Sequence, residues 1–404
     1  MIAWPLAMLL ALAAMLAGCN RTSSSNDELT IALAIYPSEA ERYRSFASDF
    51  EAREHVQVRI IAQTYNDILQ VLKVQARARG GGLDLVELDL AMLGVSMGDV
   101  APLDAIVPPQ ARRLFPAAAW QAGSAGGKLR FVPHRLMWQA MIYNRIEVPH
   151  PPATWNELAL FARAHPGKFV LKAARYEGAI CDVMPFVWSA GGGLCSPDDA
   201  GSVRAMDFLG GLAPFLNPES AVFREASVLE AQARGSVWIH FNWPFAIGYL
   251  QSKGLAPSVD MSAPLPAGPD GMATPLGGGY LGIPISAPHP ALAAKFIKYL
   301  LNPETQRRLS HDLGWYGSVA PEPGSEEAQL YAGYTAMRPY VRARPAVDCY
   351  TQLSNRWQST IRAVMIDHQP AAAALAGLAA QLEVKSDARS DNLNERCGCA
   401  SVPP

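Results

Sequence analysis

The sequence predicts an α/β protein built from two lobes. At 404 residues, the chain is longer than the size at which a single hydrophobic core usually stops growing. Between residues 29 and 90, strand-like and helix-like segments alternate in the order β-α-β-α-β, which is typical of a parallel sheet covered by helices. Half of the residues are hydrophobic and 17% are charged, which is the composition of a folded globular body.

Residue periodicity defines the first five elements. An apolar strand is predicted at residues 29–34, followed by a helix at 39–54 and a strand with alternating polarity at 56–60. A second helix passes through Ile68 and Leu72 and ends at Arg79, before three glycines. The mostly apolar run 83–90 completes the unit. In sheets of this kind, ligands lie beyond the carboxyl ends of the strands. The buried face of the first helix is expected to carry Ala40, Tyr43, Phe46 and Phe50.

The middle of the chain predicts a further series of short strands. Thr154 and Glu157 have the spacing of a capping box and therefore begin a helix. Another helix follows Pro290 and ends at Asn302. Residues 386–404 are polar and are expected to form a loose tail. The short strands are expected at residues 131–133, 141–143, 169–171 and 237–241.

The N-terminus is typical of an export signal. Residues 6–17 form an uninterrupted apolar run that is too short to span a bilayer comfortably. The run ends in Leu16-Ala17-Gly18-Cys19, and a polar, serine-rich stretch follows, so this region resembles the bacterial lipobox. We therefore expect a signal peptide at 1–18, a lipid on Cys19 and a flexible tether at 19–28, on the periplasmic or cell-surface side of a bacterial membrane.

Five further cysteines predict disulfides, because export places them in an oxidising compartment. Cys181 and Cys195 would close a short loop, and Cys349 could pair with Cys397 or Cys399. Five is an odd number, so one thiol stays free or the pairs differ, and the connectivity is open. The spacing Cys397-Gly398-Cys399 does not fit a zinc site, and we expect no metal.

Charge and motifs exclude several functions. The formal net charge is -2, so the chain has no basic excess with which to bind nucleic acid. It contains no Gly-x-Ser-x-Gly, His-Glu-x-x-His or phosphate-loop motif, and no cofactor is implied. Strand alternation would put Glu87 and Asp89 on one face, where they could serve as a carboxylate pair for glycoside hydrolysis. Alternatively, one carboxylate at the strand end binds a ligand or caps the next helix. An enzyme is the weaker hypothesis.

Aromatic residues favour a binding protein. Sugars present flat apolar faces ringed by hydroxyl groups, so their binding sites combine aromatic rings with polar side chains. Trp243 lies between Asn242 and Pro244 at a predicted strand end, which makes it the best candidate to contact a ligand. Four tryptophans lie beside turn residues: Trp138, Trp188, Trp243 and Trp315.

Ordered motifs resemble the solute-binding proteins of ABC importers, the family that includes maltose-binding protein. Residues 142–144 with 151–158 (Ile-Tyr-Asn, then Pro-Pro-Ala-Thr-Trp-Asn-Glu-Leu) resemble one family segment. The other matching segments are 83–89 with 101–104, 264–266 with 275–284, and 294–297 with 302–306. Asn242-Trp243-Pro244 and Arg344-Pro345 resemble the trehalose/maltose branch.

The resemblance implies a type II periplasmic-binding-protein fold, with parallel-sheet lobes joined by hinge strands. One lobe would comprise 29–135 and 280–315, and the other 136–279 and 316–385, with crossings near 134–136, 278–282 and 313–320. The implied ligand contacts are Glu39, Asp89, Trp243, Gly278, Tyr280, Trp315 and Arg344, with Trp138 at the position aligned to an acidic sugar-binding residue.

The same resemblance implies a monomeric, non-enzymatic protein that captures a sugar and delivers it to an ABC permease. The sugar would be a disaccharide, a small oligosaccharide or a glycoside. The alternatives are a polyol, a glycerophosphodiester or another phosphorylated solute, and a secreted enzyme that acts on glycans.

Overall fold

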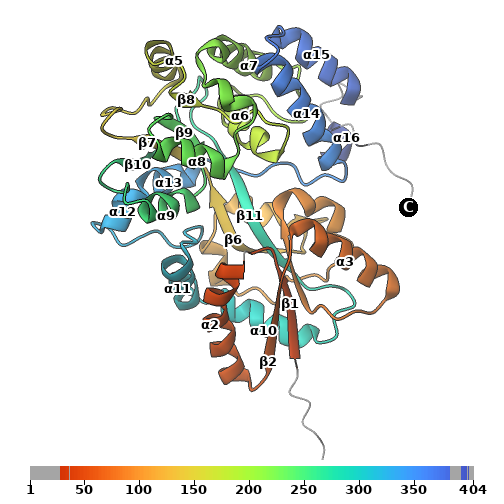
Figure 1. Cartoon of the computed structure of the whole chain (residues 1–404). Helices are drawn as coiled ribbons and strands as arrows, with labels where there is room; N and C mark the ends of the chain where they lie inside the picture. Colours follow the sequence, from red (N-terminus) through yellow and green to blue (C-terminus); the bar gives the residue numbers. More distant parts are fainter. Residues whose placement is uncertain (1–27, 36, 383–392, 398, 400–404) are drawn as a thin grey trace, which may run out of the picture.

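The structure is a computed structural model that describes residues 28–35, 37–382, 393–397 and 399. The expected signal peptide, the lipid-bearing Cys19 and nearly all of the tether lie outside these residues. The described chain forms two α/β bodies, which we call the first lobe and the second lobe (Figure 1). The first lobe contains β1, β2 and β3 of a six-stranded sheet, whose order is β12-β11-β3-β1-β2 with β6 paired to β11. The second lobe is built around a four-stranded sheet in the order β10-β7-β9-β8.

The predicted β-α-β-α-β unit is confirmed. Strand β1 pairs in parallel with both β2 and β3, and the apolar face of the first helix is buried, with Tyr43, Phe46 and Phe50 at most 1% exposed. The five elements are β1 (Glu28–Leu33), α2 (Pro37–Glu54), β2 (Gln57–Ala62), α3 (Tyr65–Ala78) and β3 (Leu85–Asp89).

The sheets are mixed, which refines the expectation of parallel-sheet lobes. In the six-stranded sheet, β11 (Thr274–Gly282) runs antiparallel to both β3 and β6 (Val132–Trp138). In the four-stranded sheet, β7 (Ala140–Asn144) is antiparallel to β9 (Ile239–Asn242) and to β10 (Asp260–Ala263), while β8 (Phe169–Val170) is parallel to β9. In the six-stranded sheet, the antiparallel pairs are those that β11 makes with β3 and β6.

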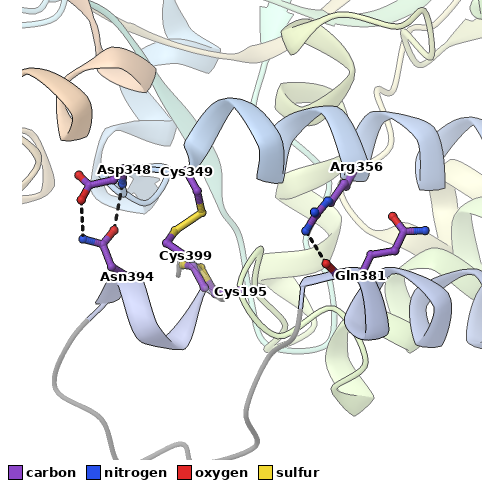
Figure 2. The surroundings of a disulfide bond; sticks show 8 residues. Cys195, Asp348, Cys349, Arg356, Gln381, Asn394 and Cys399 are labelled. Atoms are coloured by element: carbon purple, nitrogen blue, oxygen red, sulfur yellow. Dashed lines mark hydrogen bonds between the residues drawn. A yellow bond between two sulfur atoms is a disulfide. The ribbon is translucent and has the colours of Figure 1, made fainter. Parts of the chain in front are cut away.

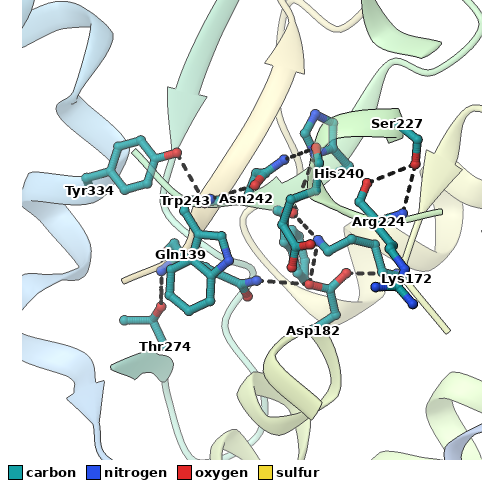
Figure 3. Close-up of polar contacts among 12 residues, drawn as sticks. Gln139, Lys172, Asp182, Arg224, Ser227, His240, Asn242, Trp243, Thr274 and Tyr334 are labelled. Atoms are coloured by element: carbon teal, nitrogen blue, oxygen red, sulfur yellow. Dashed lines mark hydrogen bonds and ion pairs between the residues drawn. The ribbon is translucent and has the colours of Figure 1, made fainter. Parts of the chain in front are cut away.

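Two long strands connect the lobes. Figure 1 shows β6 and β11 running side by side from the first lobe toward the second. Only Gln139 separates β6 from β7, so the chain changes sheets at this residue. The Thr274 hydroxyl accepts a hydrogen bond from the Gln139 amide at 3.1 Å and donates one to the Gln139 carbonyl at 2.8 Å (Figure 3). This pair ties the two connecting strands together where they enter the second lobe.

The remaining elements follow the predicted pattern in outline. Helix α5 begins as a capping box predicts, since Thr154 accepts from the Glu157 amide at 3.3 Å and Glu157 accepts from the Ala153 amide at 2.7 Å. The other helices are α4 (Ala117–Ala122), α5 (Trp155–Ala164), α6 (Glu177–Ser189), α7 (Ala200–Leu212), α8 (Glu225–Ala233), α9 (Phe245–Ser252), α10 (Pro290–Leu300), α11 (Pro303–Leu313), α12 (Glu326–Leu330), α13 (Ala332–Met337), α14 (Tyr350–Met365), α15 (Ala371–Leu382) and α16 (Leu393–Arg396). The other strands are β4 (Ser124–Ala125), β5 (Lys128–Leu129) and β12 (Val341–Arg342).

The disulfides correct one predicted pairing. Cys195 is bonded to Cys397 and Cys349 to Cys399, while Cys181 is a free, buried thiol, so the expected Cys181–Cys195 bridge is wrong. Cys181 lies inside α6 and faces the molecule's interior, whereas Cys195 follows that helix in the loop that meets the C-terminal segment. Closeness in sequence did not bring these two thiols together, because Cys181 is buried near the start of α6 and Cys195 lies beyond the other end of that helix.

Residues 393–397 and 399 are held against the second lobe, contrary to the expected loose tail, while the rest of 386–404 lies outside the described residues. Helix α16 is fastened by both disulfides, and Asn394 exchanges hydrogen bonds with Asp348 at 2.9 and 3.2 Å (Figure 2). Polar composition predicted mobility, but two covalent links fix residues 393–397 and 399. Within the described part of the chain, none of the helices has both the length and the apolar character needed to cross a membrane.

Candidate ligand-binding cleft

A cavity of about 1030 Å3, the first cavity, lies between the two lobes. On the side of the first lobe it is lined by the segments that follow β1 and β2, by Asp89 at the end of β3, and by Arg135 and Met137 of β6. The carboxyl ends of three parallel strands therefore open onto it, as expected for an α/β sheet. The second lobe contributes the beginnings of α6 and α8 together with Trp243 and Phe245.

An ionic network crosses this cavity at Arg344. The guanidinium approaches Asp89 at 3.5 Å and forms a close ion pair with Glu177 in the first turn of α6. The Tyr350 and Ser354 hydroxyls also donate to Glu177. Since Asp89 belongs to the first lobe and Glu177 to the second, Arg344 links a carboxylate of each lobe.

Asp89 caps a short helix at the end of β3, which is one of the alternatives that its position at a strand end predicted. Its Oδ1 accepts a hydrogen bond from the Ala91 amide at 2.9 Å and caps a short 3-10 helix, Leu90–Met92. Burial raises the pKa of Asp89, and the opposing effects of Arg344 and the Ala91 amide only partly offset this. The side chain still lines the first cavity, where it can accept hydrogen bonds from a polar ligand.

Glu87 belongs to a buried network beside the cavity. His134 contacts its Oε1 at 2.9 Å, the Ala34 amide donates to its Oε2 at 3.0 Å, and Tyr43 meets His134 at 3.1 Å. Burial alone would raise the pKa of Glu87, but Arg135, His134 and the Ala34 amide outweigh it and lower the pKa to about 2. Both carboxylate oxygens are engaged internally and the side chain is fully buried, so Glu87 does not act with Asp89 as a pair that faces a substrate.

Trp243 lies in the cavity wall and is held by rigid neighbours. Its amide donates to the Asn242 Oδ1 at 2.9 Å, and buried Asn242 is fixed by the Tyr334 hydroxyl at 3.1 Å (Figure 3). The indole packs directly on the backbone of Gly277, where an added Cβ would lie 2.8 Å from the ring. A side chain at position 277 would therefore displace the ring, so this glycine is needed to seat Trp243.

Gly278 has a structural reason to be glycine. Its φ is 106°, a conformation that favours glycine, and an added Cβ would collide with the Arg135 carbonyl of the paired strand. Gly278 does line the first cavity, but its main role is to let β6 and β11 approach closely.

Arg135 was not among the predicted site residues, yet its guanidinium is a central feature of the cleft. It donates to the Ala34 carbonyl at 2.5 Å and to the Tyr65 hydroxyl at 3.0 Å, and it approaches Glu87 at 3.5 Å. It also lies 5.4 Å from the centroid of the Trp315 ring. Glu177 was missed as well, because a carboxylate in the first turn of a helix usually only complements the helix dipole. One sequence pattern could have identified Arg135. Side chains alternate along β6, so Arg135 and Met137 point to the same face, which is the face toward the cleft.

A second cavity of about 540 Å3 lies on the other side of Arg135. It is bordered by α2 through Glu39 and Arg42, by the chain around Trp315, and by α9 and α12 of the second lobe. Trp315 packs against Tyr43, with 5.7 Å between the ring centroids, and Tyr316 against Tyr331, with 4.4 Å.

The predicted ligand residues fall into three groups. Asp89, Trp243, Gly278 and Arg344 line the first cavity, whereas Glu39 and Trp315 line the second. Trp138 and Tyr280 line neither cavity, so the geometry of the site does not support them as ligand contacts.

Trp138 and Tyr280 are core residues. Trp138 is 3% exposed and donates to the Tyr334 carbonyl at 2.6 Å, while Tyr280 is fully buried. Alternation along β6 puts Trp138 on the opposite face from Arg135 and Met137, and a β-bulge at 279/280 shifts the register at Tyr280. Met137, which precedes Trp138, does line the first cavity.

The arginines of the cleft are paired with carboxylates. Both arginines of the first cavity are matched by carboxylates: Arg344 by Asp89 and Glu177, and Arg135 by Glu87 and Glu39. Three or more His, Cys, Asp or Glu side chains arranged to hold a metal ion are not found among the described residues.

Comparisons with known proteins agree with this architecture. A sequence model of the family described as bacterial extracellular solute-binding protein matches residues 45–339. A probable ABC transporter-binding protein of Deinococcus radiodurans is 26% identical over 352 residues, covering 78% of this chain and 82% of the relative.

Two solved structures show the same fold. The maltose-bound MalE3 of T. maritima is 22% identical, with a TM-score of 0.74 over 88% of this chain and 99% of that protein. The cyclic α-maltosyl-1,6-maltose binding protein of Arthrobacter globiformis is 20% identical, with a TM-score of 0.75 over 87% of this chain and 96% of that protein. Both support the two-lobed architecture of the described chain.

Proposed function

We propose that this chain, which belongs to the bacterial extracellular solute-binding proteins, binds a sugar between its two lobes and delivers it to the permease of an ABC importer. The sugar is a disaccharide, a small oligosaccharide or a glycoside. The similarity to a probable ABC transporter-binding protein supports the transport partner, and the two similar maltose and maltosyl-maltose binding proteins support the ligand class.

The first cavity is the observation that carries this proposal. It combines the half-buried ring of Trp243, which offers an apolar face, with Asp89, Glu177 and amide side chains such as Asn355, which can bind hydroxyl groups. Its volume, about 1030 Å3, lies at the upper end of the range for small-molecule sites. Because both lobes contribute, a bound sugar contacts both and favours their closure.

The pairing of the arginines argues against a phosphorylated solute. A phosphate group would require an arginine with free donors or an open helix N-terminus. Arg344 is paired with Asp89 and Glu177, although its buried Nε has no hydrogen-bond partner among the described residues. The first turns of α6 and α8 carry their own carboxylates, Glu177 and Glu225. A glycerophosphodiester would therefore meet negative charge at the places where its phosphate must bind.

The burial of Glu87 argues against a glycan-acting enzyme. A glycosidase requires two carboxyl groups that flank the scissile bond. Glu87 is fully buried and hydrogen-bonded to His134 and the Ala34 amide, so it cannot flank a scissile bond together with Asp89. The matching family is also one of solute-binding proteins.

The anchor and the division of the chain complete the proposal. Cys19 carries the lipid that holds the protein at a bacterial membrane, after removal of the signal peptide 1–18, and the monomeric binder remains close to its permease. The first lobe comprises 29–135 and 280–315, and the second 136–279 and 316–385. The strand β6, which passes from one sheet toward the other and ends one residue before β7, supports a boundary in this region.

Mass spectrometry under native conditions tests the ligand. Protein purified from its own host is expected to release a neutral saccharide. In a thermal-denaturation panel, a matching sugar at 100 times its Kd should stabilise the protein by about 2.7 kcal/mol. A phosphorylated compound as the retained ligand, or the absence of any stabilisation across mono-, di- and oligosaccharides, would overturn the proposal.

A further inference from the structure

The cleft between the lobes is divided by a partition. Three side chains line both cavities: Arg135 and Met137 of β6, and Phe245 at the start of α9. Residues 135 and 137 point to the same face because side chains alternate along a strand, and Phe245 approaches from the second lobe. We call these three side chains the partition.

Arg135 is the fixed part of this partition. Its guanidinium is held by the Ala34 carbonyl, the Tyr65 hydroxyl and Glu87, and its side chain is only 10% exposed. These partners come from the segment after β1, from α3 and from β3, and Trp315 lies under the guanidinium. Moving Arg135 aside would leave buried Glu87 without its main charge partner, which is costly in a low-dielectric interior.

The other two members are held less firmly. Met137 is half-buried on β6, and Phe245 is 49% exposed. Their side chains narrow the opening that Arg135 leaves between the cavities. Truncating them should widen the opening at little cost in stability, because exposed apolar atoms contribute little to folding.

We infer that Arg135 sets the length of ligand that this protein accepts, by ending the sugar site on the side of α2 and α11. This inference rests on the proposed function. The bound saccharide occupies the first cavity. When a saccharide has more rings than the first cavity can hold, the additional rings do not extend into the second cavity. Arg135 is therefore a specificity-determining residue, and the aromatic side chains Trp315 and Tyr316 of the second cavity contact no sugar in the natural protein.

A chain-length series tests this inference. Affinities are measured by calorimetry for saccharides of one to five rings, with the linkage that gives the largest thermal stabilisation. For the natural protein we expect the affinity to reach a plateau, with no gain from further rings. Arg135→Gln opens the partition. In this variant we expect saccharides longer than the length at which the plateau begins to bind with at least tenfold higher affinity than shorter ones.

A second variant guards against misfolding of Arg135→Gln. The double substitution Met137→Ala with Phe245→Ala opens the partition without disturbing Glu87, and we expect a smaller gain for the same longer saccharides. Arg135→Lys keeps a cation in the wall and should retain the plateau. Arg42→Ala, which alters only the second cavity, should leave the natural protein's affinities unchanged and should reduce the gain in the opened variants.

The outcomes separate the inference from the proposed function. If the natural protein gains affinity with every added ring and loses that gain in Arg42→Ala, the ligand already spans both cavities and the inference is wrong. It is also wrong if opening the partition leaves the length profile unchanged. If no saccharide of any length binds the natural protein, the proposed function itself is wrong, and the inference is lost with it.

Discussion

Trp243 shows how a single side chain acquires its place in the cleft. Its ring rests on Gly277, and its backbone is fixed through Asn242 and Tyr334. The indole therefore needs little ordering when a ligand arrives, and a pre-organised aromatic surface loses less entropy on binding than a mobile one.

Trp243→Ala is expected to weaken sugar binding strongly and leave the fold intact. Loss of a central aromatic contact typically costs at least about 2 kcal/mol, or roughly thirtyfold in Kd. Calorimetric titration with the identified sugar provides the measurement. Trp238→Ala is a matched control, because Trp238 belongs to the same lobe, stacks on His165 and lines neither cavity. Equal affinities for Trp243→Ala and the natural protein would remove this residue from the site.

Glu87 links the stability of the fold to pH. Its pKa is lowered from 4.5 to about 2, so the folded state holds the ionised form more strongly than the unfolded state does. A lowered carboxyl pKa gives stability that is present above pH 4.5 and is lost as the pH falls toward about 2. The difference of 2.5 pKa units corresponds to about 3 kcal/mol.

Glu87→Gln is therefore expected to lower the free energy of unfolding by about 3 kcal/mol at neutral pH. The deficit should shrink steadily between pH 4.5 and pH 2, because the natural protein loses this contribution there. Urea denaturation at a series of pH values gives the comparison, with Glu41→Gln, which removes an exposed carboxylate of α2, as the control. A deficit that is constant with pH would contradict the assignment.

At the scale of elements, α16 and its disulfides fix the segment that leads into α14. Cys349 immediately precedes Tyr350, whose hydroxyl donates to Glu177, and Arg344 lies five residues before Cys349. The C-terminal segment thus restrains a part of the chain that lines the first cavity.

Removing the Cys349–Cys399 bond through Cys399→Ser is expected to cost about 2–4 kcal/mol of stability. We also expect weaker sugar binding, since the segment from Arg344 to Tyr350 loses a restraint. Thermal denaturation with and without a reductant measures the first effect, and titration measures the second. The reductant should destabilise the natural protein far more than a variant that lacks all four bonded cysteines. Equal responses would show that the bonds do not support the fold.

At the scale of the whole molecule, the paired strands β6 and β11 connect the lobes, so movement of one lobe relative to the other bends these strands. The two strands pair along most of their length. Thr274, the first residue of β11, is hydrogen-bonded to Gln139, the residue between β6 and β7. The first cavity lies beside this connection and is lined from both sides. A ligand that contacts both lobes stabilises the closed arrangement by its additional contacts.

Small-angle X-ray scattering should therefore record a smaller radius of gyration when the identified sugar is added. The same sugar concentration should leave the radius of Trp243→Ala unchanged, because that variant binds too weakly to be saturated. Scattering curves of the natural protein that are identical with and without saturating sugar would contradict ligand-driven closure of the lobes.

Local patterns were sufficient to predict much of the fold. The β-α-β-α-β unit, the capping box at Thr154 and the helix after Pro290 depend on residues close together in sequence, and all three are confirmed. Of the ligand residues that the family resemblance implies, four lie in the first cavity. Trp138 and Tyr280 could not be judged from the sequence, because strand alternation and a bulge decide which side chains enter the core.

The sequence by itself determined the class of fold, the family and the presence of an aromatic residue at the end of β9, because periodicity and motif order are properties of neighbouring residues. Only the tertiary structure decided the disulfide pairing, the network of Arg344 with Glu177 and the division of the cleft by Arg135. The disulfides and the Arg344–Glu177 pair join residues fifty or more positions apart, which no local pattern relates. Packing of the two lobes brings them together, and packing also selects which of the available side chains meet.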